Sequence, residues 1–88
     1  MIVCWDEEAW DDYVALQKED KRMVRKIHTF IRDIKRHGYD SGGQDELLRY
    51  LDGGWHSKRI DKKNRFVYRI LDGRIEIIQC RNHYQGKR

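Results

Sequence analysis

The sequence has no long apolar run, and cysteine is scarce. No segment approaches the roughly 18 consecutive apolar residues that would span a bilayer. The N-terminal stretch MIVCWDEEAW is acidic where a secretory signal would be basic. The two cysteines, Cys4 and Cys80, match neither a CxxC pair nor a disulfide framework, so we expect reduced thiols in the core. These absences argue against a membrane or secreted protein, and we expect a cytoplasmic one.

Familiar ligand-binding motifs are also missing. No His or Cys pair at ligand spacing has a second pair elsewhere in the chain, so the sequence gives no support for a metal site. The glycine stretches SGG at 41–43 and DGG at 52–54 lack the lysine and the following helix of a phosphate-binding loop. We therefore expect no metal and no cofactor.

Charge is distributed unevenly along the chain. Residues 1–20 contain seven acidic residues and one basic residue, whereas the other 68 residues contain 18 basic and 8 acidic ones. An arginine-rich surface suits polyphosphate, because arginine offers a forked set of donors to phosphate oxygens. Charged residues also decorate ordinary helix faces, so composition alone leaves nucleic-acid binding open.

Local signals predict a strand followed by two helices. The apolar run Ile2–Trp5 precedes Asp6, which can cap a helix of about three turns. Asp20 opens a second helix that ends at Gly38, where a left-handed cap is expected. Each helix carries a stripe at helical spacing: Trp10, Tyr13, Val14 and Gln17 in the first, and Met23, Val24, Ile27, Phe30, Ile31 and Ile34 in the second. Their tight connection predicts a helical hairpin.

From Trp55 onward the apolar period changes to two. Three strands are expected at residues 55–60, 65–71 and 74–80, after loops at 39–46 and 52–54. The Asp72-Gly73 pair suits a type I′ hairpin, which fixes the register of the last two strands. One face then pairs Ile70 with Ile75, Tyr68 with Ile77 and Phe66 with Gln79, and the other pairs Arg69 with Glu76, Val67 with Ile78 and Arg65 with Cys80.

The predicted fold class is α+β. We expect one domain over residues 1–88, with a basic tail at 85–88. The N-terminal strand and the helical hairpin pack on one face of an antiparallel sheet. The opposite face stays open, and Arg65 points outward on it.

The chain contains candidates for general acid–base chemistry on RNA. Cleavage through the 2′-hydroxyl needs a base beside that hydroxyl, an acid beside the departing 5′ oxygen, and cations around the phosphate. Histidine suits the acid, because its pKa near ~6.5 leaves a useful fraction protonated at neutral pH. His83 follows the last strand in a basic segment, whereas His28, His37 and His56 have structural explanations. Glu46, beside the first loop, is the candidate base.

Several basic residues are available to hold a phosphate, and an aromatic residue adjoins His83. The basic candidates are Arg49, Lys58, Arg59, Arg65 and Arg81. Tyr84 can orient a group or stack on a base. Strict alternation places Arg65 and His83 on opposite faces, so a bulge or a strand end after Cys80 has to turn His83 back.

Together these residues resemble a known family. The segments WDEEAWDDYVALQKEDKRMVRKIHTFIRDIKR, ELLR at 46–49, WHSKRIDKKNRFVYRI and CRNHY are similar to the YoeB branch of the RelE/ParE toxin superfamily, over residues 2–84. The resemblance implies a microbial-ribonuclease fold and a metal-independent, ribosome-dependent messenger RNA endonuclease. It also implies a cognate YefM-like antitoxin, with operator DNA bound only through that antitoxin, and leaves room for a homodimer.

The resemblance also implies roles for single residues. The catalytic base falls on Glu46, the phosphate-stabilising arginine on Arg65, the general acid on His83 and the substrate-orienting tyrosine on Tyr84. Basic residues near the RNA are implied at Arg49, Lys58 and Arg59.

The sequence departs from the family pattern in three places. Gln44-Asp45 precede Glu46 where a proline is expected, Asn82 stands where an aromatic residue is common, and residues 85–88 extend the usual end. Two alternatives stay open: a gyrase-inhibiting toxin of the same fold and a noncatalytic nucleic-acid-binding module. The presence of Glu46, His83 and Tyr84 argues against the gyrase inhibitor, whose branch is expected to lack the acid and base.

Overall fold

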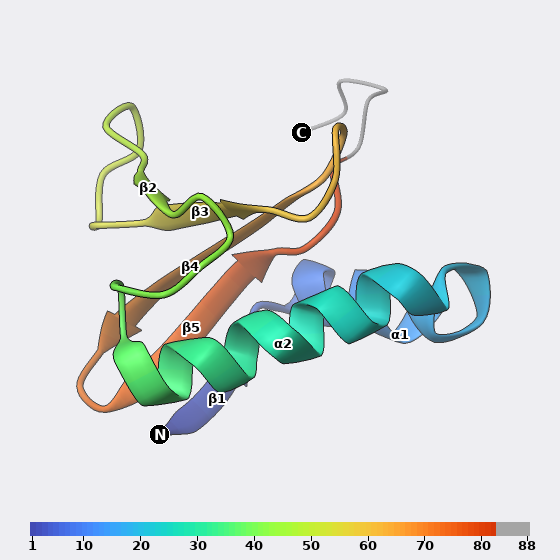
Figure 1. The fold of residues 1–88 in the computed structure, drawn as a ribbon, viewed down its shortest axis with the longest axis horizontal. Coiled ribbons are helices and arrows are strands. Elements are labelled where there is room, and N and C mark those ends of the chain that lie inside the picture. Colours follow the sequence, from blue (N-terminus) through green and yellow to red (C-terminus); the bar gives the residue numbers. More distant parts are fainter. Residues whose placement is uncertain (83–88) are drawn as a thin grey trace.

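Five strands and two helices make up the fold of residues 1–82, the part of the chain that the computed structural model describes (Figure 1). In chain order they are β1 Ile2–Trp5, α1 Glu7–Glu19, α2 Lys21–His37, β2 Glu46–Leu47, β3 His56–Arg59, β4 Arg65–Leu71 and β5 Arg74–Gln79. Neither helix is long and apolar enough to cross a membrane.

Capping side chains explain the helical hairpin. The Asp6 carboxylate accepts a hydrogen bond from Glu8 N at 3.2 Å and begins α1. Asp20 serves both helices: its backbone N–H donates to Leu16 O at 2.9 Å, and its carboxylate accepts from Met23 N at 3.1 Å. A single residue therefore ends α1 and begins α2, which forces a sharp reversal. The predicted strand and helical hairpin are confirmed.

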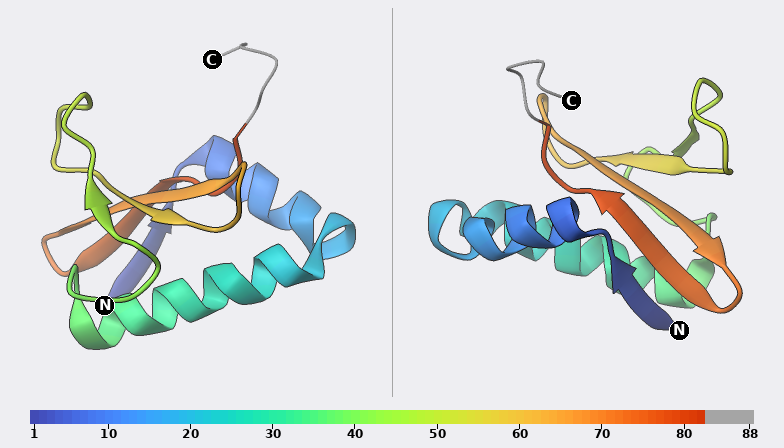
Figure 2. Two further views of the ribbon diagram at one scale, coloured as in Figure 1. Left: turned by 45° about the horizontal axis from the view of Figure 1, so that its top comes forward. Right: turned by 180° about the vertical axis from the view of Figure 1, so that it is seen from behind.

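The sheet is mixed, with strand order β1-β5-β4-β3-β2. The meander β3-β4-β5 is antiparallel as predicted. The N-terminal strand was expected on one face of the antiparallel sheet, beside the helices; instead β1 joins the sheet as an edge strand, parallel to β5, so the sheet is mixed. Strand β2 was not predicted; it is only two residues long and pairs with β3. Both helices lie on one side of the sheet, and the loop between β2 and β3 projects away from them (Figure 2).

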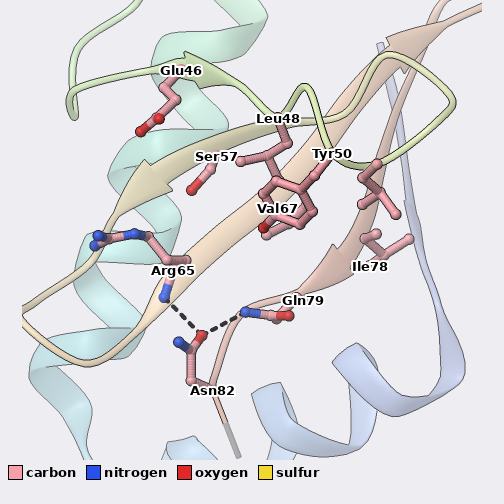
Figure 3. A pocket seen from close by; sticks show the side chains of 10 residues that line it. Glu46, Leu48, Tyr50, Ser57, Arg65, Val67, Ile78, Gln79 and Asn82 are labelled. Carbon is pink, nitrogen blue, oxygen red and sulfur yellow. Dashed lines mark hydrogen bonds between the residues drawn. The ribbon is translucent and has the colours of Figure 1, made fainter. Parts of the chain in front are cut away.

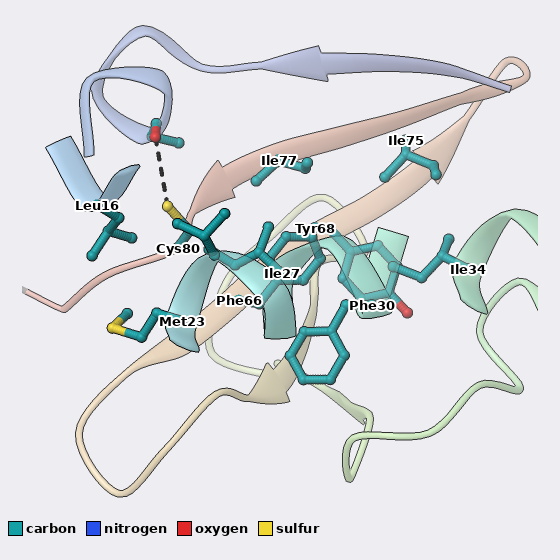
Figure 4. Close-up of a cluster of buried hydrophobic side chains, with 12 residues drawn as sticks. Leu16, Met23, Ile27, Phe30, Ile34, Phe66, Tyr68, Ile75, Ile77 and Cys80 are labelled. Carbon is teal, nitrogen blue, oxygen red and sulfur yellow. Dashed lines mark hydrogen bonds between the residues drawn. The ribbon is translucent and has the colours of Figure 1, made fainter. Parts of the chain in front are cut away.

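The core lies between the helices and the sheet (Figure 4). It contains Ala9, Leu16, Met23, Val24, Ile27, Phe30, Ile34, Phe66, Tyr68, Ile75, Ile77 and Cys80, all buried. The Cys80 thiol donates to Ala9 O at 3.6 Å, and burial raises its pKa to about 12. Cys80 is thus a core thiol as expected, whereas Cys4 is half-buried.

A β-bulge shifts the register of the last hairpin. Ile70 with Ile75, Arg69 with Glu76 and Tyr68 with Ile77 pair as predicted, but Val67 lies opposite Gln79. The predicted pairs of Phe66 with Gln79, Val67 with Ile78 and Arg65 with Cys80 are wrong, because β5 contains one extra residue at this point. The bulge lets Cys80 enter the core, while Ile78 and Gln79 both line the opposite face.

Candidate active site

A cleft of about 550 Å³ lies on the sheet face that the helices leave uncovered (Figure 3). Four parts of the chain form it: β2 with the loop behind it, β3, β4 and the end of β5. Its lining residues are Glu46, Leu48, Tyr50, Leu51, Ser57, Arg65, Val67, Ile78, Gln79 and Asn82. The cleft therefore contains two predicted catalytic residues, Glu46 and Arg65.

Arg65 begins β4 and offers an unused donor. Its backbone N–H donates to Asn82 Oδ1 at 3.3 Å, and the same oxygen accepts from Gln79 Nε2 at 2.5 Å. The Nη1 atom of Arg65 is shielded from solvent and has no hydrogen-bond partner within residues 1–82. A buried donor without a partner is destabilising, and an anion that accepted its hydrogen would relieve this.

Arg59 adds a second positive charge beside Arg65. The two arginines lie opposite each other on β3 and β4, so their side chains leave the same face of the sheet. Like charges in such a pair repel each other, and a bound anion would reverse that effect. The end of the cleft at Arg65 is thus suited to a phosphate group.

Glu46 reaches the cleft from β2. Its backbone pairs with Ser57 of β3, and its side chain makes no hydrogen bond or ion pair within the described residues. In Figure 3 the carboxylate of Glu46 and the guanidinium of Arg65 point to the same side of the cleft. An unpaired carboxylate near a cationic phosphate site is able to accept a proton from a bound substrate.

The remaining wall of the cleft is apolar. Tyr50 is 84 % exposed, and Leu48, Leu51, Val67 and Ile78 continue this surface. The loop that carries Tyr50 is held at its far end by Arg69, whose Nη1 donates to Gly53 O at 3.0 Å and whose guanidinium lies 4.3 Å from the ring centroid of Trp55. An exposed ring on a held loop provides a stacking surface for a nucleobase.

Two basic residues predicted to hold phosphate are engaged elsewhere. The side chain of Lys58 is fully buried on the helix-facing side of the sheet, and its ammonium forms an ion pair with Asp45 at 3.0 Å. Lys58 is therefore directed away from the cleft. The guanidinium of Arg81 forms an ion pair with Glu19 of α1, which raises the pKa of Arg81. Arg49 is exposed in the loop after β2 and remains available.

Two catalytic candidates, His83 and Tyr84, lie outside the described residues. Asn82, the last described residue, lines the cleft and is bonded to His83 along the chain. Asn82, Tyr50 and Leu51 were not predicted as cleft residues. The sequence did contain a signal for Tyr50: an aromatic residue next to Arg49, between two loops, indicates an exposed ring that binds a ligand.

Within residues 1–82, no three histidine, cysteine, aspartate or glutamate side chains gather as metal ligands would. The Tyr13 hydroxyl of α1 lies 2.6 Å from His28 Nε2 on α2, and His56 Nδ1 lies 2.6 Å from Asp45 Oδ1. Both histidines are thus engaged away from the cleft, as their structural explanations predicted.

Solved structures of bacterial toxins share this architecture. A YoeB/ParE toxin from Agrobacterium tumefaciens has 43% identity and a TM-score of 0.88, covering 96% of this chain and 100% of that one. Two structures from Staphylococcus aureus, a YoeB-YefM complex and a YoeB dimer, have 34% and 35% identity and TM-scores of 0.88 and 0.87, each covering 96% of this chain and 98% of the solved one. Fold and cleft thus define a toxin of the RelE/ParE type.

Sequence comparison places the chain within that class. Toxin YoeB of Escherichia coli strain K12 is 40% identical over 84 residues, which cover 96% of this chain and 100% of the relative. Residues 5–84 match the model of the YoeB-like toxin of bacterial type II toxin-antitoxin systems. The chain belongs to this family and is a toxin of a type II toxin-antitoxin system.

Proposed function

We propose that this toxin is an endoribonuclease that cleaves messenger RNA in the ribosomal A site through the 2′-hydroxyl of the substrate. The observation that carries the proposal is the buried Nη1 of Arg65, in a cleft that also contains the Glu46 carboxylate; neither group has a side-chain partner among residues 1–82. A phosphodiester supplies both missing partners, since its oxygens accept from the guanidinium and the neighbouring 2′-hydroxyl donates toward the carboxylate.

The proposed reaction is a transesterification. Glu46 accepts the proton of the 2′-hydroxyl, and the 2′ oxygen bonds to phosphorus. The bond from phosphorus to the 5′ oxygen breaks, and His83 donates a proton to that oxygen as it departs. The upstream fragment ends in a 2′,3′-cyclic phosphate and the downstream fragment begins with a 5′-hydroxyl. The chain requires no metal ion for these steps.

Charge stabilisation falls to the arginines. The phosphorus carries additional negative charge when five oxygens surround it, and a preorganised donor at this position stabilises that state more than the bound substrate. Arg65 provides the donor, Arg59 adds positive charge from β3, and Arg49 contacts the backbone of the RNA. Tyr84 orients the substrate, and the exposed ring of Tyr50 carries a flanking base.

Partners follow from membership of the family. We expect a YefM-like antitoxin with an acidic segment that folds over the cleft, because the cleft combines an apolar wall with cationic residues. Operator DNA is bound only through that antitoxin. We also expect self-association, as in the YoeB dimer of Staphylococcus aureus. A toxin that acts on ribosomes works in the cytoplasm.

Primer extension on a defined messenger in a purified translation system tests the proposal. The wild-type toxin and the variants Glu46→Gln and His83→Gln are compared with and without ribosomes. We expect ribosome-dependent cuts by the wild type that are lost in His83→Gln and reduced to a slow residual rate in Glu46→Gln. Translation arrest without cuts would overturn the nuclease and favour ribosome blockade. An unaffected translation reaction would direct attention to gyrase or another DNA target.

A further inference from the structure

A cluster of buried and half-buried polar groups lies behind Glu46, on the helix-facing side of the sheet. We call it the Asp45 cluster; it comprises Ser41, Asp45, His56, Lys58 and Tyr68. Three donors converge on the Asp45 carboxylate: His56 Nδ1 at 2.6 Å, Lys58 Nζ at 3.0 Å and the hydroxyl of Tyr68. They come from β3 and β4, whereas Asp45 belongs to the loop that leads into β2.

The Lys58 ammonium is fully hydrogen-bonded in this cluster. The Lys58 ammonium has three N–H donors, and it finds three acceptors in Asp45, Ser41 Oγ at 2.7 Å and Gly42 O. Burial, together with its hydrogen bond to Asp45, holds the pKa of Tyr68 far above its usual range. The Tyr39 ring stacks on His56 with centroids 3.8 Å apart. Such a network permits one arrangement of its members, because any displacement leaves a buried charge without a partner.

Strand β2 fixes the backbone of Glu46 but leaves its neighbours to orient the side chain. It contains two residues, both exposed, and its pairing with β3 is flanked by two backbone hydrogen bonds, from Arg59 N to Gly43 O at 3.0 Å and from Leu48 N to Trp55 O at 2.9 Å. The preceding residues turn sharply, with Gly43 at φ 89° and Gln44 at φ 55°. Asp45 is thus the first residue before Glu46 that is anchored in the interior.

The alternation of a strand links Asp45 to the cleft. Neighbouring residues of an extended chain point to opposite faces, so fixing Asp45 on the buried side directs Glu46 to the other. The observed positions agree, since the Asp45 side chain is 9 % exposed within the cluster and Glu46 lines the cleft. We infer that Asp45, held by Lys58, Tyr68 and His56, is a positioning residue that fixes the Glu46 carboxylate for proton abstraction.

This inference rests on the proposed function, because it requires Glu46 to be the base. Stability alone gives a poorer account of the cluster. A buried ion pair contributes little net stability compared with apolar residues of the same volume, so its charges are not needed to fill the interior. Accurate placement of a catalytic carboxylate is, by contrast, sensitive to shifts of about 1 Å, which can lower a rate 10²-fold.

A double-mutant cycle between Asp45→Asn and Glu46→Gln separates positioning from stability. Single-turnover cleavage on programmed ribosomes gives the rate at saturating toxin and the half-saturating toxin concentration. We expect Asp45→Asn alone to lower the saturating rate about 10–100-fold, with the half-saturating concentration changed less than about threefold. In the Glu46→Gln background the same substitution should change the rate less than about twofold, because its target carboxylate is gone.

Two further variants keep the test decisive. Tyr68→Phe removes one donor to Asp45 without changing the ring, and it replaces Asp45→Asn in the cycle if that variant does not fold. Ile27→Val, a core truncation on α2, is the control for lost stability, and we expect it to cleave at the wild-type rate.

The possible outcomes are distinct. Equal losses of rate from Asp45→Asn in both backgrounds, or a wild-type rate in Asp45→Asn, would overturn the positioning role while leaving Glu46 as the base. A wild-type rate in Glu46→Gln alone would overturn the proposed function, whatever Asp45 does.

Discussion

Replacing Arg65 should lower cleavage activity without lowering stability. Arg65→Met keeps the length of the apolar stem and removes the guanidinium. A single preorganised donor to a charged transition state is worth about 10²–10³ in rate, or ~3–4 kcal/mol, so we expect cleavage to fall by this factor. Arg65→Lys keeps the positive charge but loses the forked pair of donors, and its cleavage rate should lie between those of the wild type and Arg65→Met.

The stability of Arg65→Met should be preserved or increased. In the wild type, Nη1 of Arg65 is buried without a partner within residues 1–82, and Arg59 lies directly opposite on β3. An unpartnered buried donor costs about 1–3 kcal/mol, and the facing like charge adds to this. We therefore expect the free energy of unfolding to stay equal or to rise by about 1 kcal/mol.

Urea denaturation measures the free energy of unfolding, and single-turnover primer extension measures cleavage. Arg74→Met is the matched control, because Arg74 also has a buried nitrogen without a partner within residues 1–82 but lies on β5 beside Glu76, outside the cleft. We expect Arg74→Met to cleave at the wild-type rate. Cleavage by Arg65→Met within tenfold of wild type, or a loss of more than about 2 kcal/mol in stability, would refute the role given to Arg65.

Three other predictions concern the core and the cleft wall. Lys58→Met should lower the free energy of unfolding by about 1.5–3 kcal/mol, because it removes the lysine partner of Asp45 and leaves that carboxylate with His56 and Tyr68 alone. Urea denaturation should show recovery in the Lys58→Met/Asp45→Asn double variant. Equal instability of the single and double variants would contradict the role of the ion pair. Tyr50→Ala should weaken binding of a short RNA by about 1–3 kcal/mol in fluorescence titration, whereas Tyr39→Phe should not. Burial raises the pKa of Cys80 to about 12, so on raising the pH the thiol of the unfolded chain ionises before that of the folded one, and the free energy of unfolding falls between about pH 9 and 12. Urea titrations at a series of pH values should show a smaller fall for Cys80→Ala. An unchanged dependence of the free energy of unfolding on pH would show that Cys80 does not contribute.

Local signals in the sequence were sufficient for much of the fold. Asp6, Asp20 and Gly38 act through hydrogen bonds within a few residues, and the Asp72-Gly73 turn fixes the pairing next to it. The bulge at Ile78 was not predictable in the same way, because it depends on Cys80 reaching a core that only the helices complete. The parallel pairing of β1 with β5 likewise requires contact between distant segments.

The candidate site was predicted only in part, because it too depends on contacts between segments that are distant in the sequence. Glu46 and Arg65 line one cleft as expected, although they come from segments separated by β3. Lys58 and Arg59 are adjacent on a strand, so only one of them can face the cleft, and alternation could not tell which. The choice depends on Asp45, whose carboxylate binds the Lys58 ammonium from a loop that shows no regular pattern in the sequence.

The central claim is that the 2′-hydroxyl of the messenger attacks the phosphate held in the cleft. It is tested most directly with a messenger that carries a single 2′-deoxy nucleotide immediately before the mapped cut, translated to the same position by purified ribosomes. Our account predicts that cleavage at this bond disappears, while the unmodified messenger yields an upstream fragment ending in a 2′,3′-cyclic phosphate. Undiminished cleavage of the 2′-deoxy messenger would contradict it.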